Sequence, residues 1–129
     1  MLEIKAIQSK TEQEQICGLC GIAYDADCMA YAAHENNKLL GAVQFRILGG
    51  YAVIYDLANA CGLDDTPALI IIGKAALNFI DLCGVQDVII KAGDGLPEAL
   101  GFARDKHGAW RVNLDGYFDA PCQKRPAPS

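Results

Sequence analysis

The chain has 129 residues, 52% of them hydrophobic, and a formal net charge of −5. This size and composition predict one compact domain at residues 1–120, followed by a flexible, proline-rich tail at 121–129. The acidic balance argues against nucleic-acid or membrane-surface partners, which need clustered Lys and Arg. The opening residues are polar and no long apolar run follows. We therefore expect neither a signal peptide nor a membrane span, and a cytoplasmic location.

The N-terminal segment predicts one strand and one short helix. Apolar and polar residues alternate over residues 2–7, which is typical of a half-buried strand. Thr11 is followed three residues later by Glu14, the arrangement of a capping box, so we expect the helix to begin there. Gly21 should end this helix, because glycine readily adopts the left-handed conformation found after helices.

Residues 28–60 predict three strands in a meander. The turns fall at residues 36–37 and 49–50, where Asn and Gly accept the positive φ that tight hairpins require. Period-two alternation then places two sets of side chains, each on one face of its strand: Val43, Phe45 and Ile47, and Val53, Tyr55 and Leu57.

The next segment predicts a buried helix over residues 67–82. Thr66 is a suitable N-cap and Pro67 a suitable first helical residue, and Gly84 should follow the last turn. The polar residues of the helix are spaced so that they form one narrow exposed stripe on an otherwise buried surface: Lys74, Asn78 and Asp81.

The last third of the chain predicts a near-continuously apolar strand at 86–93, a short helix within 95–103 and a hairpin at 102–118. The apolar strand should be central and covered on both faces. The resulting order is β-α-β-β-β-α-β-α-β-β. It predicts a mixed α/β (α+β) fold in which the sheet is mostly antiparallel, with one parallel pair joined by the helix at 67–82.

Three stretches resemble the GNAT superfamily of acyl-CoA N-acyltransferases, and the resemblance covers about residues 2–118. They are "YDLANACGLDDTPALIIIGKAALNFI" (55–80), "GVQDVII" (84–90) and "ALGFARDKHGAWRVNLDGYF" (99–118). The resemblance implies a GNAT-like sheet of six to seven strands with helices packed on it. It also implies acyl transfer from acyl-CoA to a small amine or a peptide amine.

The loop that holds coenzyme A in that family departs from its pattern here. The family carries Arg or Gln, two variable residues, Gly, one more variable residue, then Gly or Ala, so that backbone N–H groups can hold the pyrophosphate. Asp64, Pro67 and Leu69 stand at those three positions. Pro67 removes a donor, Leu69 adds bulk, and Asp64 and Asp65 add negative charge. We therefore expect acetyl-CoA to bind weakly or not at all.

The resemblance also implies where the cofactor would lie. The backbone of Leu57 and Asn59 would hydrogen-bond the pantetheine arm, and the N–H groups of Ala68, Leu69 and Ile70 would face the pyrophosphate.

Asp56 is the candidate catalytic residue, because some members carry a carboxylate there that deprotonates the amine through water. We expect it to point away from Tyr55 and Leu57. The alternative is a carboxylate that is exposed or paired with Arg46. The tyrosine that often protonates the leaving thiolate is replaced by Pro97.

The cysteines and histidines are better explained by structural roles than by catalysis or metal binding. Six cysteines without regular spacing or an export signal indicate reduced thiols. Cys17 and Cys20 fall inside the predicted helix and no second pair follows, so we expect Cys28 and His34 to complete no zinc site. His107 lies at a predicted turn.

Four other residues are expected to serve packing or assembly. Cys61 and Cys83 lack a basic partner in the sequence and should be packing residues, whereas Tyr117 and Phe118 should cover a sheet edge or form part of a homodimer contact.

Three hypotheses remain for the whole chain. It is a divergent N-acetyltransferase, a degenerate binding protein with an impaired coenzyme A site, or an assembly subunit whose sheet edge pairs with another copy.

Overall fold

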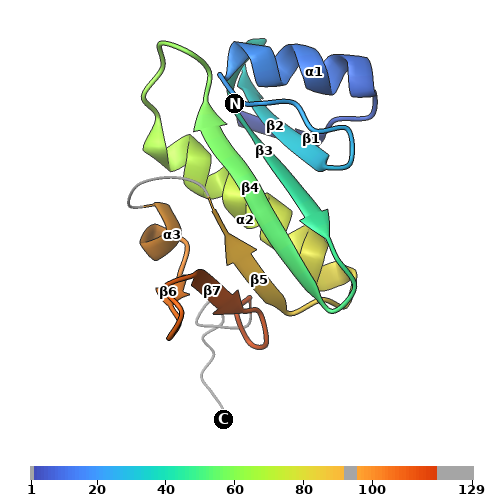
Figure 1. Cartoon of the computed structure of the whole chain (residues 1–129). Helices are drawn as coiled ribbons and strands as arrows, with labels where there is room; N and C mark the ends of the chain where they lie inside the picture. The colour runs from blue at the N-terminus through green and yellow to red at the C-terminus, as the bar shows by residue number, and fades with distance from the viewer. Residues whose placement is uncertain (1, 92–95, 119–129) are drawn as a thin grey trace.

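The computed structural model describes residues 2–91 and 96–118, so the predicted tail at 121–129 and the end of the predicted strand at 86–93 lie outside the described residues. Within them, strands and helices follow the predicted order (Figure 1): β1 (Leu2–Ala6), α1 (Lys10–Leu19), β2 (Met29–Glu35), β3 (Lys38–Ile47), β4 (Tyr51–Asn59), α2 (Thr66–Leu82), β5 (Asp87–Ile90), α3 (Leu96–Ala99), β6 (Ala103–Arg104) and β7 (Trp110–Asn113). None of the helices in these two ranges is long and apolar enough to cross a membrane.

One sheet contains all the described strands, in the order β1-β2-β3-β4-β5-β7-β6. Every neighbouring pair is antiparallel except β4 and β5, which run parallel and pair from Tyr51–Asp87 to Ile54–Ile90. Helix α2 makes the crossover between these two strands and lies behind β4 in Figure 1. The mixed sheet with one parallel pair is confirmed. The turns of the meander are confirmed too, with positive φ at Asn36, Asn37 and Gly49.

The sheet separates two hydrophobic clusters of different size. The larger fills the face covered by α2, where Val43, Phe45 and Ile54 are fully buried against the helix residues Ile72 and Leu77. The smaller lies under α1 and joins Ile16, Cys17 and Cys20 to the alanines of β2 and β3. Alternate residues of the meander therefore feed opposite cores, as the period of a strand requires.

The exposed face of α2 is wider than predicted. Lys74 and Asn78 are exposed, in agreement with the predicted polar stripe, whereas its third residue, Asp81, is half-buried. Two large apolar side chains share that face, because Ile71 is 45% exposed and Leu82 is 75% exposed. Only the inner side of the helix matches the expected pattern, with seven buried residues.

Both helix caps differ from those predicted. Ser9, and not Thr11, caps α1, with its Oγ accepting the N–H three residues on at 3.2 Å. Asp65, and not Thr66, caps α2, with its carboxylate accepting the Ala68 N–H at 3.1 Å. Thr11 and Thr66 are good capping residues, but both stand inside the first helical turn. In each helix an equally good capping residue comes earlier in the sequence and takes the cap position.

A β-bulge interrupts strand β4 where the candidate catalytic residue lies. Gln44 pairs with Asp56, whereas the next residue of β3 pairs with Ile54, so Tyr55 is the extra residue. The prediction that Val53, Tyr55 and Leu57 share one face is therefore wrong, because both Ile54 and Leu57 belong to the core under α2. The bulge lets Tyr55 and Asp56 line the same cleft, so the expectation that Asp56 points away from Tyr55 is wrong as well.

Strand β5 is central but covered less fully than predicted. It pairs with β4 on one side and with β7 on the other. Val88 and Ile90 are buried, whereas Asp87 and Ile89 are only half-buried. The prediction of a strand covered on both faces is wrong, because Ile89, whose side chain alternates with those of Val88 and Ile90, is only half-buried and lines an open pocket.

Candidate functional site

An open cleft lies between the loop after α1 and the adjacent parts of β4 and β5. Its volume is about 590 Å³, and it is lined by Ala23, Tyr24, Asp25, Ala26, Tyr55, Asp56 and Lys91. The cleft is formed because the bulge in β4 turns both side chains of its two bulged positions outward, while the loop after α1 folds over them. Three segments that are distant in the sequence therefore meet at one place.

Asp56 is half-buried in this cleft and is held by one hydrogen bond. The Gln44 Nε2 donates to Asp56 Oδ2 at 3.1 Å. Within the described ranges no ion pair joins Asp56 to Arg46, so the alternative of a cross-strand salt bridge is not realised. The carboxylate therefore has one oxygen fixed by a neutral amide and no cation paired with it in the described part.

The remaining cleft groups favour a positively charged guest. Asp25 and Asp56 contribute two carboxylates against the single ammonium of Lys91, and Tyr24 contributes an aromatic ring of the kind that attracts cations. Burial and the nearby negative charge of Glu14 raise the pKa of Tyr24, so its phenol stays protonated. Sequence reasoning missed Tyr24 and Asp25, because they come from a loop whose position relative to β4 no local pattern reveals.

Lys91 is the cation of the cleft. Its Nζ lies 5.6 Å from the centre of the Tyr55 ring, a cation–π contact between β5 and the bulge of β4. Its backbone N–H donates to Ile54 O at 2.9 Å, and this bond follows the last pair of the parallel ladder. The sequence does not indicate that Lys91 lines the cleft, because a lysine at the end of an apolar strand is usually just exposed to solvent.

Strands β4 and β5 part at this point. Strand β4 pairs with β3 as far as Asn59, whereas its pairing with β5 stops at Ile54. On the side facing β5, the backbone of residues 55–59 therefore has no strand partner among the described residues. Leu57 is buried there and Asn59 half-buried. The resemblance predicts that the backbone of Leu57 and Asn59 contacts a pantetheine arm, and both residues lie on this open edge.

The loop between β4 and α2 is closed by its own side chains. Asn59 Nδ2 donates to Leu40 O at 3.0 Å and to Asp65 O at 3.1 Å, and its Oδ1 accepts the Asp65 N–H at 3.0 Å. These bonds hold Asp65 where its carboxylate caps α2. The side chain of Asn59 therefore positions the loop, and only its backbone remains for a ligand.

The N-terminus of α2 has few free donors. The Ala68 N–H is bound by the Asp65 carboxylate, the Leu69 N–H donates to Asp65 O at 3.3 Å, and Pro67 has none. The Leu69 side chain is 7% exposed and packs in the core, and Ile70 is half-buried. A phosphate has little to bind here, since the helix already holds a carboxylate.

Among the described residues near Pro97, no free phenol replaces the missing tyrosine. Pro97 is buried in α3, and its carbonyl accepts the Phe102 N–H at 2.8 Å. Tyr117 donates its hydroxyl to Leu100 O at 2.6 Å, and burial raises its pKa. The ring of Tyr117 packs against Phe118, with 4.8 Å between the ring centres. Both aromatic residues therefore close the end of α3.

The cysteines divide into a protected and an exposed set. Burial raises the pKa of Cys20 to about 11 and that of Cys28 to about 12, and Cys17 is buried as well. Cys61 and Cys83 are exposed, so the prediction that they are packing residues is wrong. The five cysteines in the described ranges are free, and those ranges contain no group of His, Cys, Asp or Glu side chains suited to a metal.

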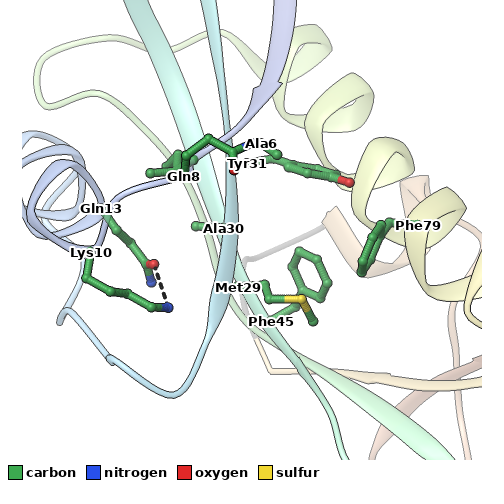
Figure 2. A pocket seen from close by; sticks show the side chains of 10 residues that line it. Ala6, Gln8, Lys10, Gln13, Met29, Ala30, Tyr31, Phe45 and Phe79 are labelled. Atoms are coloured by element: carbon green, nitrogen blue, oxygen red, sulfur yellow. Dashed lines mark hydrogen bonds between the residues drawn. The ribbon is translucent and has the colours of Figure 1, made fainter.

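A second cavity of about 220 Å³ lies beside α1 (Figure 2). Its wall is apolar and includes Met29, Tyr31, Phe45 and Phe79, and Lys10 stands on the opposite side. No carboxylate and no cysteine lines it, so the cleft at Asp56 is the better candidate for chemistry.

Comparisons with known proteins agree with this architecture. No protein-family model and no curated protein matches the chain in sequence. A GNAT family acetyltransferase from Brucella melitensis in complex with acetyl-CoA superposes with a TM-score of 0.68 at 11% identity, covering 100% of this chain and 94% of that one. The ribosomal-protein-S18-alanine N-acetyltransferase from Escherichia coli gives 0.63 at 11% identity, covering 88% and 90%.

A third structure extends the likeness to coenzyme A complexes. The PaiA N-acetyltransferase from Thermoplasma acidophilum in complex with coenzyme A gives a TM-score of 0.60 at 10% identity, covering 87% of this chain and 97% of that one. The protein therefore has the fold of the GNAT acetyltransferases. At these identities the likeness establishes the fold, and the expected GNAT-like sheet is confirmed.

Proposed function

We propose that the protein is an N-acyltransferase that moves an acyl group from a thioester to a small amine or a peptide amine. The observation that carries this proposal is the juxtaposition of Asp56, in an open cleft, with the free backbone edge of β4 where β5 leaves it. Neighbours with this fold are N-acetyltransferases, and two of them were crystallised with coenzyme A or acetyl-CoA, which supports the proposal.

In this proposal the chain's own residues bind and deprotonate the acceptor. The acyl thioester supplies an activated acyl group, and its pantetheine arm lies along the backbone of Leu57 and Asn59. The ammonium of the acceptor is attracted by Asp25 and Asp56. Asp56 then takes a proton from it through water, because only the neutral amine attacks a carbonyl carbon. Tyr24, which lines the same cleft and stays protonated, is the candidate to donate a proton to the leaving thiolate.

The nucleotide end of coenzyme A fits this chain poorly. Asp65 already occupies the N-terminus of α2, so Ala68, Leu69 and Ile70 offer a pyrophosphate little. We therefore propose that acetyl-CoA binds weakly and mainly through its arm. The occupied helix end also favours a second candidate, a non-catalytic binding protein that kept the cleft and lost the donor site. A cytoplasmic location and a homodimer stay predictions.

The test compares two donors that differ only in the nucleotide. Acetyl-CoA and S-acetylpantetheine should bind with dissociation constants within about threefold of each other, measured by calorimetric titration. Both should acetylate a panel of primary amines with similar kcat/KM. Asp56→Asn should lower that rate by about 10²-fold or more while leaving donor affinity unchanged. Donor binding without acetylation of any amine would favour the second candidate, and sub-micromolar acetyl-CoA binding would contradict the occupied helix end.

A further inference from the structure

A chain of hydrogen-bonded side chains runs from α1 through the protein to the candidate catalytic carboxylate. Lys10 Nζ donates to Gln13 Oε1 at 3.2 Å, and Figure 2 shows these two side chains facing each other. Gln13 Nε2 donates to Gln44 Oε1 at 2.9 Å, and Gln44 Nε2 donates to Asp56 Oδ2 at 3.1 Å. The chain thus begins at an ammonium group and ends at a carboxylate.

The two amides in the middle are deeply buried. Gln13 is 1% exposed and Gln44 is 0% exposed. Burying an amide is unfavourable unless its polar atoms are bonded, and here both are. Gln13 Nε2 also reaches the carbonyls of Asp25 and Cys28, and Gln44 Nε2 also donates to Ala23 O at 2.9 Å. These bonds tie α1 and the loop after it to the central strands.

The direction of this chain is fixed from both sides. Lys10 has donors only, so it demands the oxygen of Gln13 and leaves the Gln13 amide nitrogen for Gln44. The Asp25 N–H independently donates to Gln44 Oε1 at 3.1 Å. Flipping either amide would bring two donors or two acceptors together. The nitrogen of Gln44 must therefore face Asp56, which as a carboxylate only accepts.

We infer that Gln44 is a positioning residue for Asp56, and that Gln13 and Lys10 set the orientation of its amide. This inference rests on the proposed function, in which Asp56 accepts the proton of the amine. Gln44 occupies Oδ2 and leaves Oδ1, which has no partner among the described residues, to meet the acceptor or its water. Gln44 is also the partner of Asp56 across the bulge, so one residue fixes both backbone register and carboxylate rotamer.

The first arm of the test measures amine binding without any acyl donor. The probe is n-butylamine, and its binding is followed in every variant by the backbone amide resonances of Tyr24, Asp25 and Tyr55, which line the cleft. Gln44→Met should weaken the probe's affinity about tenfold, and Asp56→Asn by at least as much. The double variant should bind no more weakly than Asp56→Asn, because Gln44 acts only through Asp56. Thr11→Ala, an exposed change on α1, should have no effect.

The second arm tests whether the Gln44 amide is hydrogen-bonded to the Asp56 carboxylate in solution. In the natural protein, the side-chain amide resonances of Gln44 should shift as acid protonates Asp56, and Asp56→Asn should abolish that shift. Lys10→Met leaves the buried amides in place and keeps the test available if Gln44→Met does not fold. It should weaken the probe's binding by about twofold to threefold through the freed amide of Gln13.

The outcomes separate this inference from the proposed function. Amine binding by the natural protein without acyl transfer to any amine would refute the proposed function alone. Full amine affinity in Gln44→Met, losses that add in the double variant, or a Gln44 amide that ignores the titration of Asp56 would each overturn the inference. In kinetic assays the inference expects the loss to fall on KM for the amine, with KM for the thioester unchanged.

Discussion

Replacing Asp65 with serine isolates what the carboxylate at the mouth of α2 does to an anionic ligand. Asp65 accepts the Ala68 N–H at 3.1 Å and so neutralises the helix end. Serine is an equally good N-cap, so Asp65→Ser removes the charge and keeps a hydrogen bond for the same donor. We expect the variant to fold normally and to bind acetyl-CoA more tightly than the natural protein.

The size of the gain follows from Coulomb's law. A carboxylate about 6 Å from a phosphate charge is unfavourable by about 3 kcal/mol at an effective dielectric near 20. Asp65 is half-buried, so solvent and salt reduce this to about 1–2 kcal/mol. The affinity for acetyl-CoA should therefore rise about fivefold to thirtyfold. The unfolding free energy should fall by no more than about 1 kcal/mol, the usual contribution of a negative charge at a helix N-terminus.

Calorimetric titration provides the assay, with S-acetylpantetheine titrated in parallel. The gain should be confined to acetyl-CoA, since the pantetheine thioester carries no phosphate. Asp64→Ser is the matched control, because Asp64 is exposed and caps nothing, and it should change affinity by less than about twofold. An unchanged affinity in Asp65→Ser, or an equal gain with S-acetylpantetheine, would refute the argument that this carboxylate blocks the phosphate.

The remaining predictions concern packing, thiols and pH. Gly41→Ala should lower the unfolding free energy by about 1–3 kcal/mol, because its Cβ would lie 2.7 Å from a backbone oxygen of β4. In the control Gly18→Ala, the Cβ meets no atom within 4 Å, and the variant should be slightly more stable than the natural protein. Equal melting temperatures of the two variants would contradict this prediction. Alkylation at pH 8 should label the exposed Cys61 and Cys83 well before the buried thiols, of which Cys20 has a pKa raised to about 11 and Cys28 one raised to about 12. The denatured protein should show six free thiols. Early labelling of the buried cysteines would contradict this prediction. Burial raises the folded-state pKa of Tyr117, so its contribution to stability is complete below about pH 10, the unfolded value, and is lost as pH rises through the folded value. Tyr117→Phe should therefore reduce the loss of unfolding free energy at alkaline pH. An unchanged dependence of the unfolding free energy on pH would contradict this prediction.

Much of the fold could be predicted because its signals are local. Asparagine and glycine pairs mark the turns of the meander, and a long apolar helix followed by Gly84 marks the crossover to β5. The caps were misplaced where two capping residues stand in a row, as at Asp65 and Thr66, since sequence alone does not show which residue leaves the helical conformation.

The site was predicted less completely because it depends on register. The alternation Val53, Tyr55, Leu57 continues unbroken through the bulge in the sequence, so nothing local shows that Tyr55 is the extra residue. Asp56 was found by its place on the fourth strand, but the pairing that puts Gln44 beside it exists only in the folded sheet. In the sequence, Leu69 is notable only because it replaces the second glycine of the coenzyme A loop. In the structure it is a core residue, so Leu69→Gly should lower the unfolding free energy by about 3–5 kcal/mol.

The internal cap of α2 also determines how folding depends on cofactor supply. A helix whose N-terminus waits for a phosphate becomes more stable when the ligand binds, by about 2.7 kcal/mol at a concentration one hundred times its dissociation constant. Here Asp65 and Asn59 complete the first turn within the chain itself. The last helix before β5 is therefore assembled as soon as the protein folds. The stability of the folded protein should therefore depend little on the nucleotide cofactor, because a ligand that binds weakly adds little to the unfolding free energy.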